Sequence, residues 1–308
     1  MCTYICRFVI PMRKISYTVP PALDGSCVAA VLRSHGFSTA LLRSLKKTYG
    51  ALCRNGCPVR TVDPVHTGDI VAVELNTDGA TAPPSAEKAV IVYADRDILV
   101  VNKRAGMAMY ETYNHHGNAL SNAVTAAGFD GPFRPIYRLD KDTSGLVVLA
   151  RHRLSAAKLA GRVQKDYYAV VPGAYTGSGT VDAPIGHCPD STVKRQVDPA
   201  GVRAVTHWEA LGQQGGRTLL RVQLETGRTH QIRVHFAHLG TPLVGDSLYG
   251  TALIGARHLL HCKTIRLMHP VREEPVTFDC PFPSDMEEWN QCLPTAPTTS
   301  LPASCCPP

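Results

Sequence analysis

Residues 138–145 read Arg-Leu-Asp-Lys-Asp-Thr-Ser-Gly, and the apolar run Leu-Val-Val-Leu-Ala follows at once at residues 146–150. Polar, turn-forming residues before a short aliphatic run predict a loop that delivers a carboxylate to the mouth of a buried strand. Loops held by a rigid sheet are frequent sites of chemistry. Asp140 is therefore the first candidate functional residue, although the same residue types also suit a capped turn without a chemical role.

A second segment favours a chemical role. Residues 225–235 read Glu-Thr-Gly-Arg-Thr-His-Gln-Ile-Arg-Val-His, so that two arginines, two histidines and a glutamine fall within one short stretch. Cationic side chains with several hydrogen-bond donors bind anionic groups well. We therefore expect an anionic ligand at this segment.

These two segments and three others together resemble the RluA-type family of RNA pseudouridine synthases. The match runs through Arg138-Leu139-Asp140-x-x-Thr143-Ser144-Gly145, Lys165-x-Tyr167, residues 226–233, Gly245-Asp246-x-x-Tyr249-Gly250, and Leu260-His261 with His269-Pro270. Order and spacing both fit, and the resemblance covers about residues 88–283. Five motifs in sequence are far more specific than any one of them.

The resemblance implies a fold and an activity. The expected fold class is α+β, with a pseudouridine synthase fold whose mixed, largely antiparallel central sheet is flanked by helices and loops. The implied reaction isomerises uridine within RNA and needs neither a cofactor nor a metal ion. Asp140 would be the catalytic carboxylate, acting either as a nucleophile toward the sugar or as a stabiliser of positive charge on it.

The resemblance also assigns roles to side chains around Asp140. Arg228 would pair with Asp140 and keep it ionised. Tyr167 would stack on the uracil or remove a proton from the sugar or base. Three residues are assigned to RNA binding: Arg138, which would enter the RNA stack after the target nucleotide flips out, Ile232, which would form an apolar wall, and Arg233.

The N-terminal part of the chain predicts a second, smaller unit. A helical pattern from Ser26 to about Leu45 is followed by strand-like segments, and this order resembles a small S4-like α/β RNA-binding domain. Arg43, Lys46 and Lys47 would share a helix face toward phosphate. A solvated basic face on an unrelated small domain is the alternative.

These patterns divide the chain into four parts. Residues 1–75 form the S4-like domain, 76–87 a linker, 88–283 the catalytic domain, and 284–308 a C-terminal segment with a tail of disordered composition. Residues 172–204 are rich in Gly, Pro and Asp, and predict a long, mobile connection within the catalytic domain.

Composition supports a nucleic-acid partner. The net charge is +7, and residues 280–308 contribute −3 of it, which leaves +10 for residues 1–279. A basic body suits a polyanion, because Lys and Arg release counterions from phosphates, although a basic surface also serves solubility. The eleven cysteines are expected as free thiols, since the count is odd and a chain of this length needs no disulfide scaffold.

Further expectations concern location and partners. No run approaches the roughly 18 apolar residues of a membrane span, and the N-terminus lacks the layout of a signal peptide, so we expect a cytoplasmic location. The histidine spacings do not match a zinc pair on a helix. We expect a monomer that binds RNA without an obligate protein partner.

Two alternatives come from other functional classes. One is a noncatalytic RNA-binding or ribosome-assembly protein with the same fold. The other is a hydrolase of nucleosides, which would need a positioned water and usually a second carboxylate, and none is evident beside Asp140. For the synthase, ribosomal RNA is the expected substrate, and transfer RNA stays open.

Overall fold

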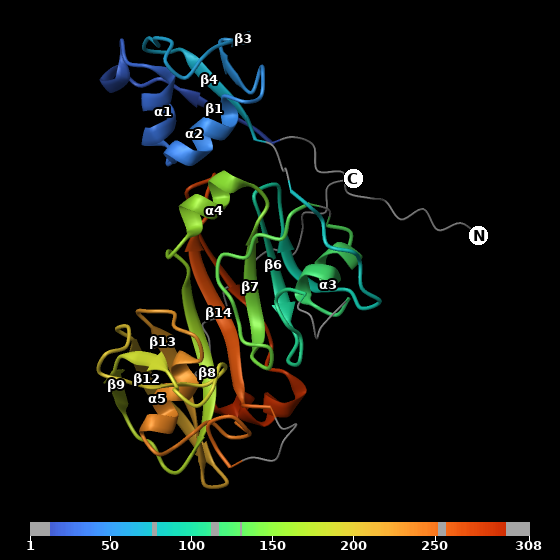
Figure 1. Cartoon of the computed structure of the whole chain (residues 1–308), viewed down its shortest axis with the longest axis vertical. Helices are drawn as coiled ribbons and strands as arrows, with labels where there is room; N and C mark the ends of the chain where they lie inside the picture. Colours follow the sequence, from blue (N-terminus) through green and yellow to red (C-terminus); the bar gives the residue numbers. More distant parts are fainter. Residues whose placement is uncertain (1–12, 76–78, 112–116, 130, 252–256, 294–308) are drawn as a thin grey trace, which may run out of the picture.

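The computed structural model describes residues 13–75, 79–111, 117–129, 131–251 and 257–293 (Figure 1). Two larger β-sheets organise this part of the chain: a four-stranded sheet near the N-terminus and a nine-stranded sheet in the remainder. A two-stranded sheet of β10 (Ile185–His187) and β11 (Arg195–Val197) is separate from both. Within the described residues, every helix is far shorter than a membrane crossing requires.

The N-terminal sheet has the strand order β1-β4-β2-β3 and packs against two helices. Its elements are β1 Arg13–Thr18, η1 Pro21–Leu23, α1 Val28–Ser34, α2 Thr39–Leu45, β2 Leu52–Arg54, β3 Cys57–Pro58 and β4 Ile70–Leu75. The hydroxyl of Ser38 accepts a hydrogen bond from the Leu41 amide at 3.2 Å and so caps the start of α2. Buried Val31, Leu32 and Leu42 join the helices to the sheet.

The expected basic helix face is shorter than the sequence suggested. Arg43 lies within α2, but the helix ends at Leu45, and Lys46 is only its C-cap. Lys47 follows outside the helix. All three cationic side chains are exposed. Because only Arg43 lies within α2, the prediction that the three share one face of a helix is wrong.

The large sheet is mixed and mostly antiparallel, which confirms the predicted α+β class. Its strand order is β5-β6-β7-β14-β8-β13-β12-β9, and β15 pairs with β14. Its strands are β5 Val90–Ala94, β6 Ile98–Lys103, β7 Ser144–Ala150, β8 Gln164–Pro172, β9 Ser178–Asp182, β12 Val205–Gln214, β13 Arg217–Leu224, β14 Leu260–Met268 and β15 Pro275–Asp279. The associated helices are α3 Leu120–Ala126, α4 Arg153–Leu159, α5 Gln231–His238 and the 3-10 helix η2 Ser284–Cys292.

One expectation about this part is wrong. Residues 172–204 were expected as a long mobile connection, but they contain β9, β10 and β11. β9 pairs with β12, and Val181 and Ile185 are buried. Short strands with a few inward-facing apolar residues were hidden by the turn-forming residues between them.

The centre of the sheet places the loop that carries Asp140. All of β7 is buried, because its apolar run is covered on both faces. β7 pairs with β14 in parallel at Ser144 and Gly145. A Cβ on Gly145 would lie 2.2 Å from the carbonyl oxygen of Cys262, and φ is +117°. Only glycine fits there, so the loop before β7 is pressed against the start of β14.

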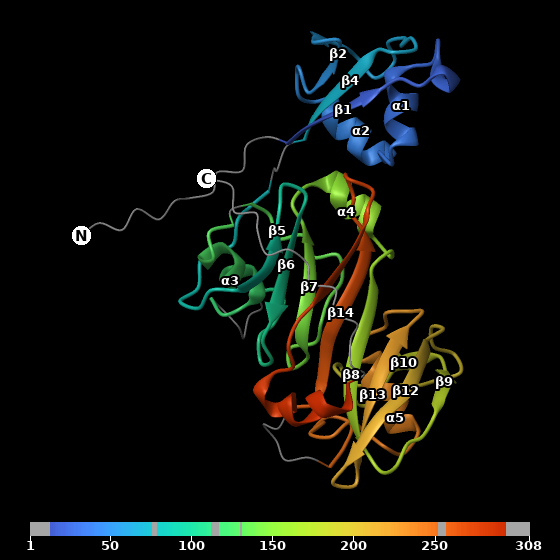
Figure 2. The same cartoon turned by 180° about the vertical axis from the view of Figure 1, so that it is seen from behind.

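The four-stranded unit rests on α4 (Figure 1). Leu154 of α4 is buried within the apolar cluster of the N-terminal unit. Arg13 of β1 forms an ion pair with Asp97, whose carboxylate also contacts His152 at the start of α4. Viewed from behind, α5 lies beside β12 at the far end of the molecule (Figure 2), and its contacts include β11.

Candidate active site

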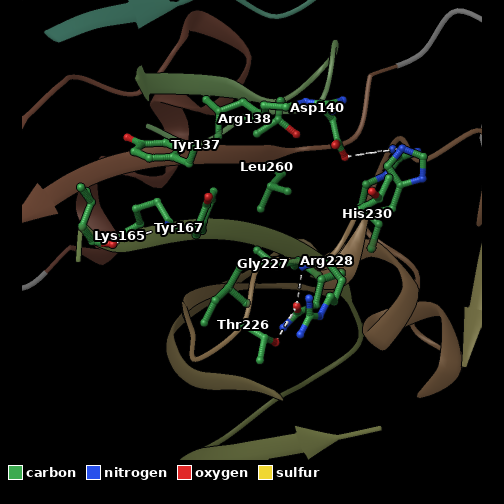
Figure 3. Close-up of a pocket in the computed structure, with 18 of the residues that line it drawn as sticks. Tyr137, Arg138, Asp140, Lys165, Tyr167, Thr226, Gly227, Arg228, His230 and Leu260 are labelled. Carbon is green, nitrogen blue, oxygen red and sulfur yellow. Dashed lines mark hydrogen bonds and ion pairs between the residues drawn. The ribbon is translucent and has the colours of Figure 1, made fainter. Parts of the chain in front are cut away.

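A cavity of about 620 Å³ opens where the two sequence motifs face each other (Figure 3). Residues 135–140 form one side of it and residues 224–233 the other. Lys165, Tyr167 and Leu260 contribute from β8 and β14. The structure therefore brings together all the predicted site residues of the catalytic motifs.

Asp140 presents its carboxylate to this cavity, and its side chain is 27% exposed. The Nη1 atom of Arg233 donates to Oδ2 of Asp140 at 3.3 Å, and Nε2 of His230 lies 3.9 Å from the same oxygen. The predicted partner, Arg228, points elsewhere: its Nε donates to the carbonyl of Arg203 at 3.1 Å. Asp140 and Arg228 both lie in the described part of the chain and form no ion pair there, so that pairing is wrong.

The start of α5 explains which arginine meets the carboxylate. The side-chain oxygen of Gln231 accepts hydrogen bonds from the Arg228 amide at 3.0 Å and the Thr226 hydroxyl at 2.8 Å. This closes a turn and leaves Arg228 on its exposed outer side. Arg233 lies in the first turns of α5 and is directed inward. In Figure 3, Arg228 accordingly lies near Thr226, while Asp140 faces His230.

Arg233 is fixed by a second carboxylate. Its Nε and Nη2 atoms donate to the two oxygens of Asp246 at 2.7 and 2.9 Å, a bidentate geometry. Burial alone would raise the pKa of Asp246, but Arg233 outweighs it and lowers that pKa. The Gly245-Asp246 motif thus supplies the partner of the arginine that holds Asp140. This role could not be predicted from the sequence, because Arg233 and Asp246 are brought together only by the fold.

His230 is held in an unusual backbone conformation, with φ of +58°. Its Nδ1 lies 2.8 Å from the hydroxyl of Tyr249, and that hydroxyl accepts the amide of Arg195 at 2.9 Å. Tyr249 and the backbone thus fix the His230 ring with Nε2 directed toward Asp140. Burial lowers the pKa of His230, so the ring is neutral at pH 7.

Tyr167 and Ile232 form buried walls of the cavity. Tyr168, the next residue on β8, points to the opposite face of the sheet and packs edge-on against Phe282, as strand alternation predicts. Burial raises the pKa of Tyr167 well above its ordinary value, and the nearby Cys262 and Asp140 add to the effect. Its phenol is thus protonated at neutral pH, which disfavours proton removal by this side chain.

The remaining predicted RNA-binding residues occupy two separate places. Arg138 is exposed at the edge of the cavity. Arg43, Lys46 and Lys47 lie in the N-terminal unit and do not line the cavity. Lys165, beside Tyr167, stacks its ammonium 4.6 Å from the ring centre of Tyr137, and burial lowers its pKa.

One cluster of possible metal ligands lies outside the cavity. Within the described residues, Asp95, Asp97 and His269 bring ligand atoms close together. Both carboxylates already have cationic partners, because Arg13 contacts Asp97 at 2.8 Å and Arg272 contacts Asp95 at 3.2 Å. The cluster is an ion-pair network that supports the contact between the two sheets.

Comparison with known proteins gives the class of this site. A family model described as RNA pseudouridylate synthase matches residues 97–238. The uncharacterized RNA pseudouridine synthase YjbO of Bacillus subtilis is 37% identical, over 82% of this chain and 94% of its own length. The ribosomal large subunit pseudouridine synthase D of Xanthomonas campestris is 36% identical, over 89% of this chain and 91% of its own.

A solved structure agrees with these relatives. Human RNA pseudouridylate synthase domain containing 1 superposes with a TM-score of 0.54 at 27% identity, over 68% of this chain and 89% of its own. The site is thus that of an RNA-modifying isomerase. The chain belongs to the RNA pseudouridine synthase family.

Proposed function

We propose that this enzyme converts specific uridines of structured RNA to pseudouridine, with ribosomal RNA as the first substrate to test and transfer RNA as the second. The observation that carries the proposal is the Asp140 carboxylate, which opens into the cavity beside Arg233. Relatives named as ribosomal large subunit pseudouridine synthase D support the choice of ribosomal RNA.

In this proposal the target nucleotide leaves the RNA stack, because C1′ of a stacked uridine is out of reach of a side chain. Arg138, exposed at the edge of the cavity, fills the vacated space. The cavity volume of about 620 Å³ lies within the range of sites that hold small molecules. Tyr167 and Ile232 hold the freed uracil by apolar contact and stacking.

Asp140 then acts on C1′, either as a nucleophile or as an ion that stabilises positive charge on the sugar. The bond from N1 to C1′ breaks, the uracil turns, and C5 bonds to C1′. C5 loses its proton and N1 gains one, so no atom leaves and no electrons are exchanged. Arg233 holds the Asp140 carboxylate in place throughout, and Arg228 contacts a phosphate at the rim.

The proposal extends to the organisation of the chain. Residues 1–75 act as an S4-like RNA-binding module through Arg43, Lys46 and Lys47, joined by the linker 76–87 to a catalytic domain at 88–283. Residues 284–308 form the C-terminal segment and tail. The enzyme works in the cytoplasm as a monomer, without an obligate protein partner, cofactor or metal ion.

Pseudouridine mapping of total RNA tests the reaction and the target together. We would compare cells that lack the gene with cells complemented by wild type, by Asp140→Ala, or by the matched control Asp142→Asn. We expect one or a few sites to vanish in the deletion and to return with wild type and Asp142→Asn only. Sites that persist in the deletion, or that return with Asp140→Ala, would support the noncatalytic RNA-binding alternative. Release of free uracil would support the hydrolase.

A further inference from the structure

The turn that carries Asp140 is held on its far side by four side chains, one for each residue from 141 to 144. The contacts are Lys103 Nζ to the Lys141 carbonyl (2.9 Å), Arg257 Nη1 to the Asp142 carbonyl (2.9 Å), His258 Nε2 to Thr143 Oγ1 (2.8 Å) and His261 Nδ1 to Ser144 Oγ (2.9 Å). We call residues 140–144 the carboxylate turn. Its position is set from behind, by side chains that do not face the substrate.

Three of the four side chains come from the start of β14 and the residues just before it. His258 and His261 are buried, and burial lowers the pKa of both, that of His261 to about 3. They are therefore neutral at pH 7 and act as hydrogen-bond partners: His258 of the Thr143 hydroxyl, and His261 of the Ser144 hydroxyl and the Cys280 thiol. Arg257 is different, because it carries a permanent charge and binds a backbone carbonyl.

Arg257 needs a counter-charge, and the C-terminal segment supplies it. Its Nε and Nη2 atoms donate to Oδ2 and Oδ1 of Asp285 at 2.5 and 3.0 Å. The Arg257 side chain is 13% exposed, and its Nη1 also contacts the carbonyls of His258 and Leu260. One guanidinium thus links the carboxylate turn, the start of β14 and η2.

The segment that carries Asp285 is itself well anchored. Met286 and Trp289 of η2 are fully buried in a cluster with Tyr168 and Phe282. This cluster lies on the face of the sheet opposite to Tyr167 and the cavity. η2 is drawn in red next to the start of β14 (Figure 2), where His261 pairs with Ser144 of the carboxylate turn. Asp285 is therefore held by packing that is independent of the cavity.

We propose that Arg257 and Asp285 are a positioning pair, through which η2 fixes the carboxylate turn and so the place of Asp140 in the active site. The inference rests on the proposed role of Asp140. Catalytic groups must be held to within about 0.5 Å of the productive geometry. Without Asp285, the guanidinium loses the bidentate partner that orients it and keeps only the carbonyls of His258 and Leu260 besides that of Asp142, so the support of the turn weakens.

The test measures pseudouridine formation by the purified full-length enzyme on total RNA from cells that lack the gene. Asp285→Asn keeps the size of the side chain and Arg257→Lys keeps its charge, but both break the paired geometry. We expect each to lower kcat about tenfold and to leave the KM for RNA within about twofold. Asp285→Glu, which keeps the charge, recovers part of kcat.

Two matched controls test whether a loss of kcat comes from lost positioning, from the changed charge of η2 or from lower stability. Glu287→Gln removes a negative charge from the same helix and leaves kcat unchanged. Asp279→Asn breaks another ion pair to β14, that with Lys263, away from the turn. It lowers thermal stability but not kcat. If Asp279→Asn slows catalysis as much as Asp285→Asn does, the effect is one of stability and the proposal fails.

A double variant tests whether the two residues act as one unit. Because both act through the same carbonyl, Arg257→Met with Asp285→Asn should be no slower than Arg257→Met alone. Rate losses that multiply, or single variants with a wild-type kcat, overturn the positioning pair. In that case the proposed function would still stand, provided that the wild-type enzyme forms pseudouridine and the Asp140→Ala variant does not. A wild-type enzyme that forms no pseudouridine would instead overturn the proposed function itself.

Discussion

The two segments that face each other across the cavity differ in how they are held. The carboxylate turn is fixed from behind by Lys103 and by residues 257–261. Opposite it, the segment 225–230, which we call the rim segment, is largely exposed and closes its turn onto Gln231. In the proposed function this difference is a division of labour: the carboxylate turn places the reacting group, whereas the rim segment offers accessible donors to RNA.

The largest effect is expected where the carboxylate turn meets β14. Gly145→Ala places a Cβ 2.2 Å from the Cys262 carbonyl at a positive φ, and should cost about 3 kcal/mol or more of unfolding free energy. Gly128→Ala is the control, since φ is also positive but nothing lies within 4 Å. It should cost only about 1 kcal/mol. Urea unfolding of both variants measures the difference, and equal losses would show that the close approach does not matter.

The next effect contrasts the two arginines. Arg233→Lys keeps the charge but loses the bidentate contact with Asp246 and the donor to Asp140, so we expect kcat to fall about 100-fold. Arg228→Lys on the rim segment should keep kcat within about threefold. Single-turnover pseudouridine formation at saturating enzyme measures both. A larger loss for Arg228→Lys would restore the pairing that the sequence predicted.

The two arginines also mark the limit of what the sequence predicts about this site. The buried strand at 146–150 and the carboxylate before it follow from local patterns, and the family resemblance selects Tyr167 for the site; the structure has all three. The choice between Arg228 and Arg233 does not, because it depends on the residue at which α5 begins. That point is set by the side chain of Gln231 and the left-handed backbone of His230, which residue types alone do not reveal.

The supports of the carboxylate turn were out of reach for a different reason. His258 and Thr143 are separated by 115 residues, and His261 and Ser144 by 117. Local periodicity has no access to such pairs. β9, β10 and β11 were missed because each is short and bounded by turn residues, so that their pairing partners, not their composition, make them strands.

A pH titration of stability sharpens the comparison. Burial, followed by the charges of Arg257 and Lys263, lowers the pKa of His261 from 6.5 to about 3. Between pH 6.5 and pH 3 the unfolded chain binds a proton at this histidine that the folded chain does not. The contribution of His261 to the unfolding free energy is therefore complete above pH 6.5 and is lost as the pH falls toward 3. The slope is about 1.4 kcal/mol per pH unit for one group.

His261→Gln should therefore flatten the decline of unfolding free energy from pH 6 to pH 4 by about that slope. Arg228→Gln on the rim segment removes no group that titrates in this range and should keep the wild-type decline. Urea unfolding at several pH values measures both. A wild-type decline in His261→Gln would mean that this histidine is not held neutral behind the turn.

The smallest effect is expected at the rim segment, and it concerns binding. Arg228 is exposed, and its side chain contacts only a backbone carbonyl, that of Arg203, among the hydrogen bonds of the described residues. Arg228→Gln should raise the KM for RNA about threefold to tenfold and leave kcat nearly unchanged. Because one phosphate contact is lost, the slope of log affinity against log salt should shrink by about one.

The exposed Arg203, whose side chain pairs with Glu225, is the matched control, and Arg203→Gln should keep more of the salt slope because that guanidinium is already engaged. A fall in kcat without a change in salt slope for Arg228→Gln would place this arginine with the carboxylate turn and end the division of labour between the two sides of the cavity.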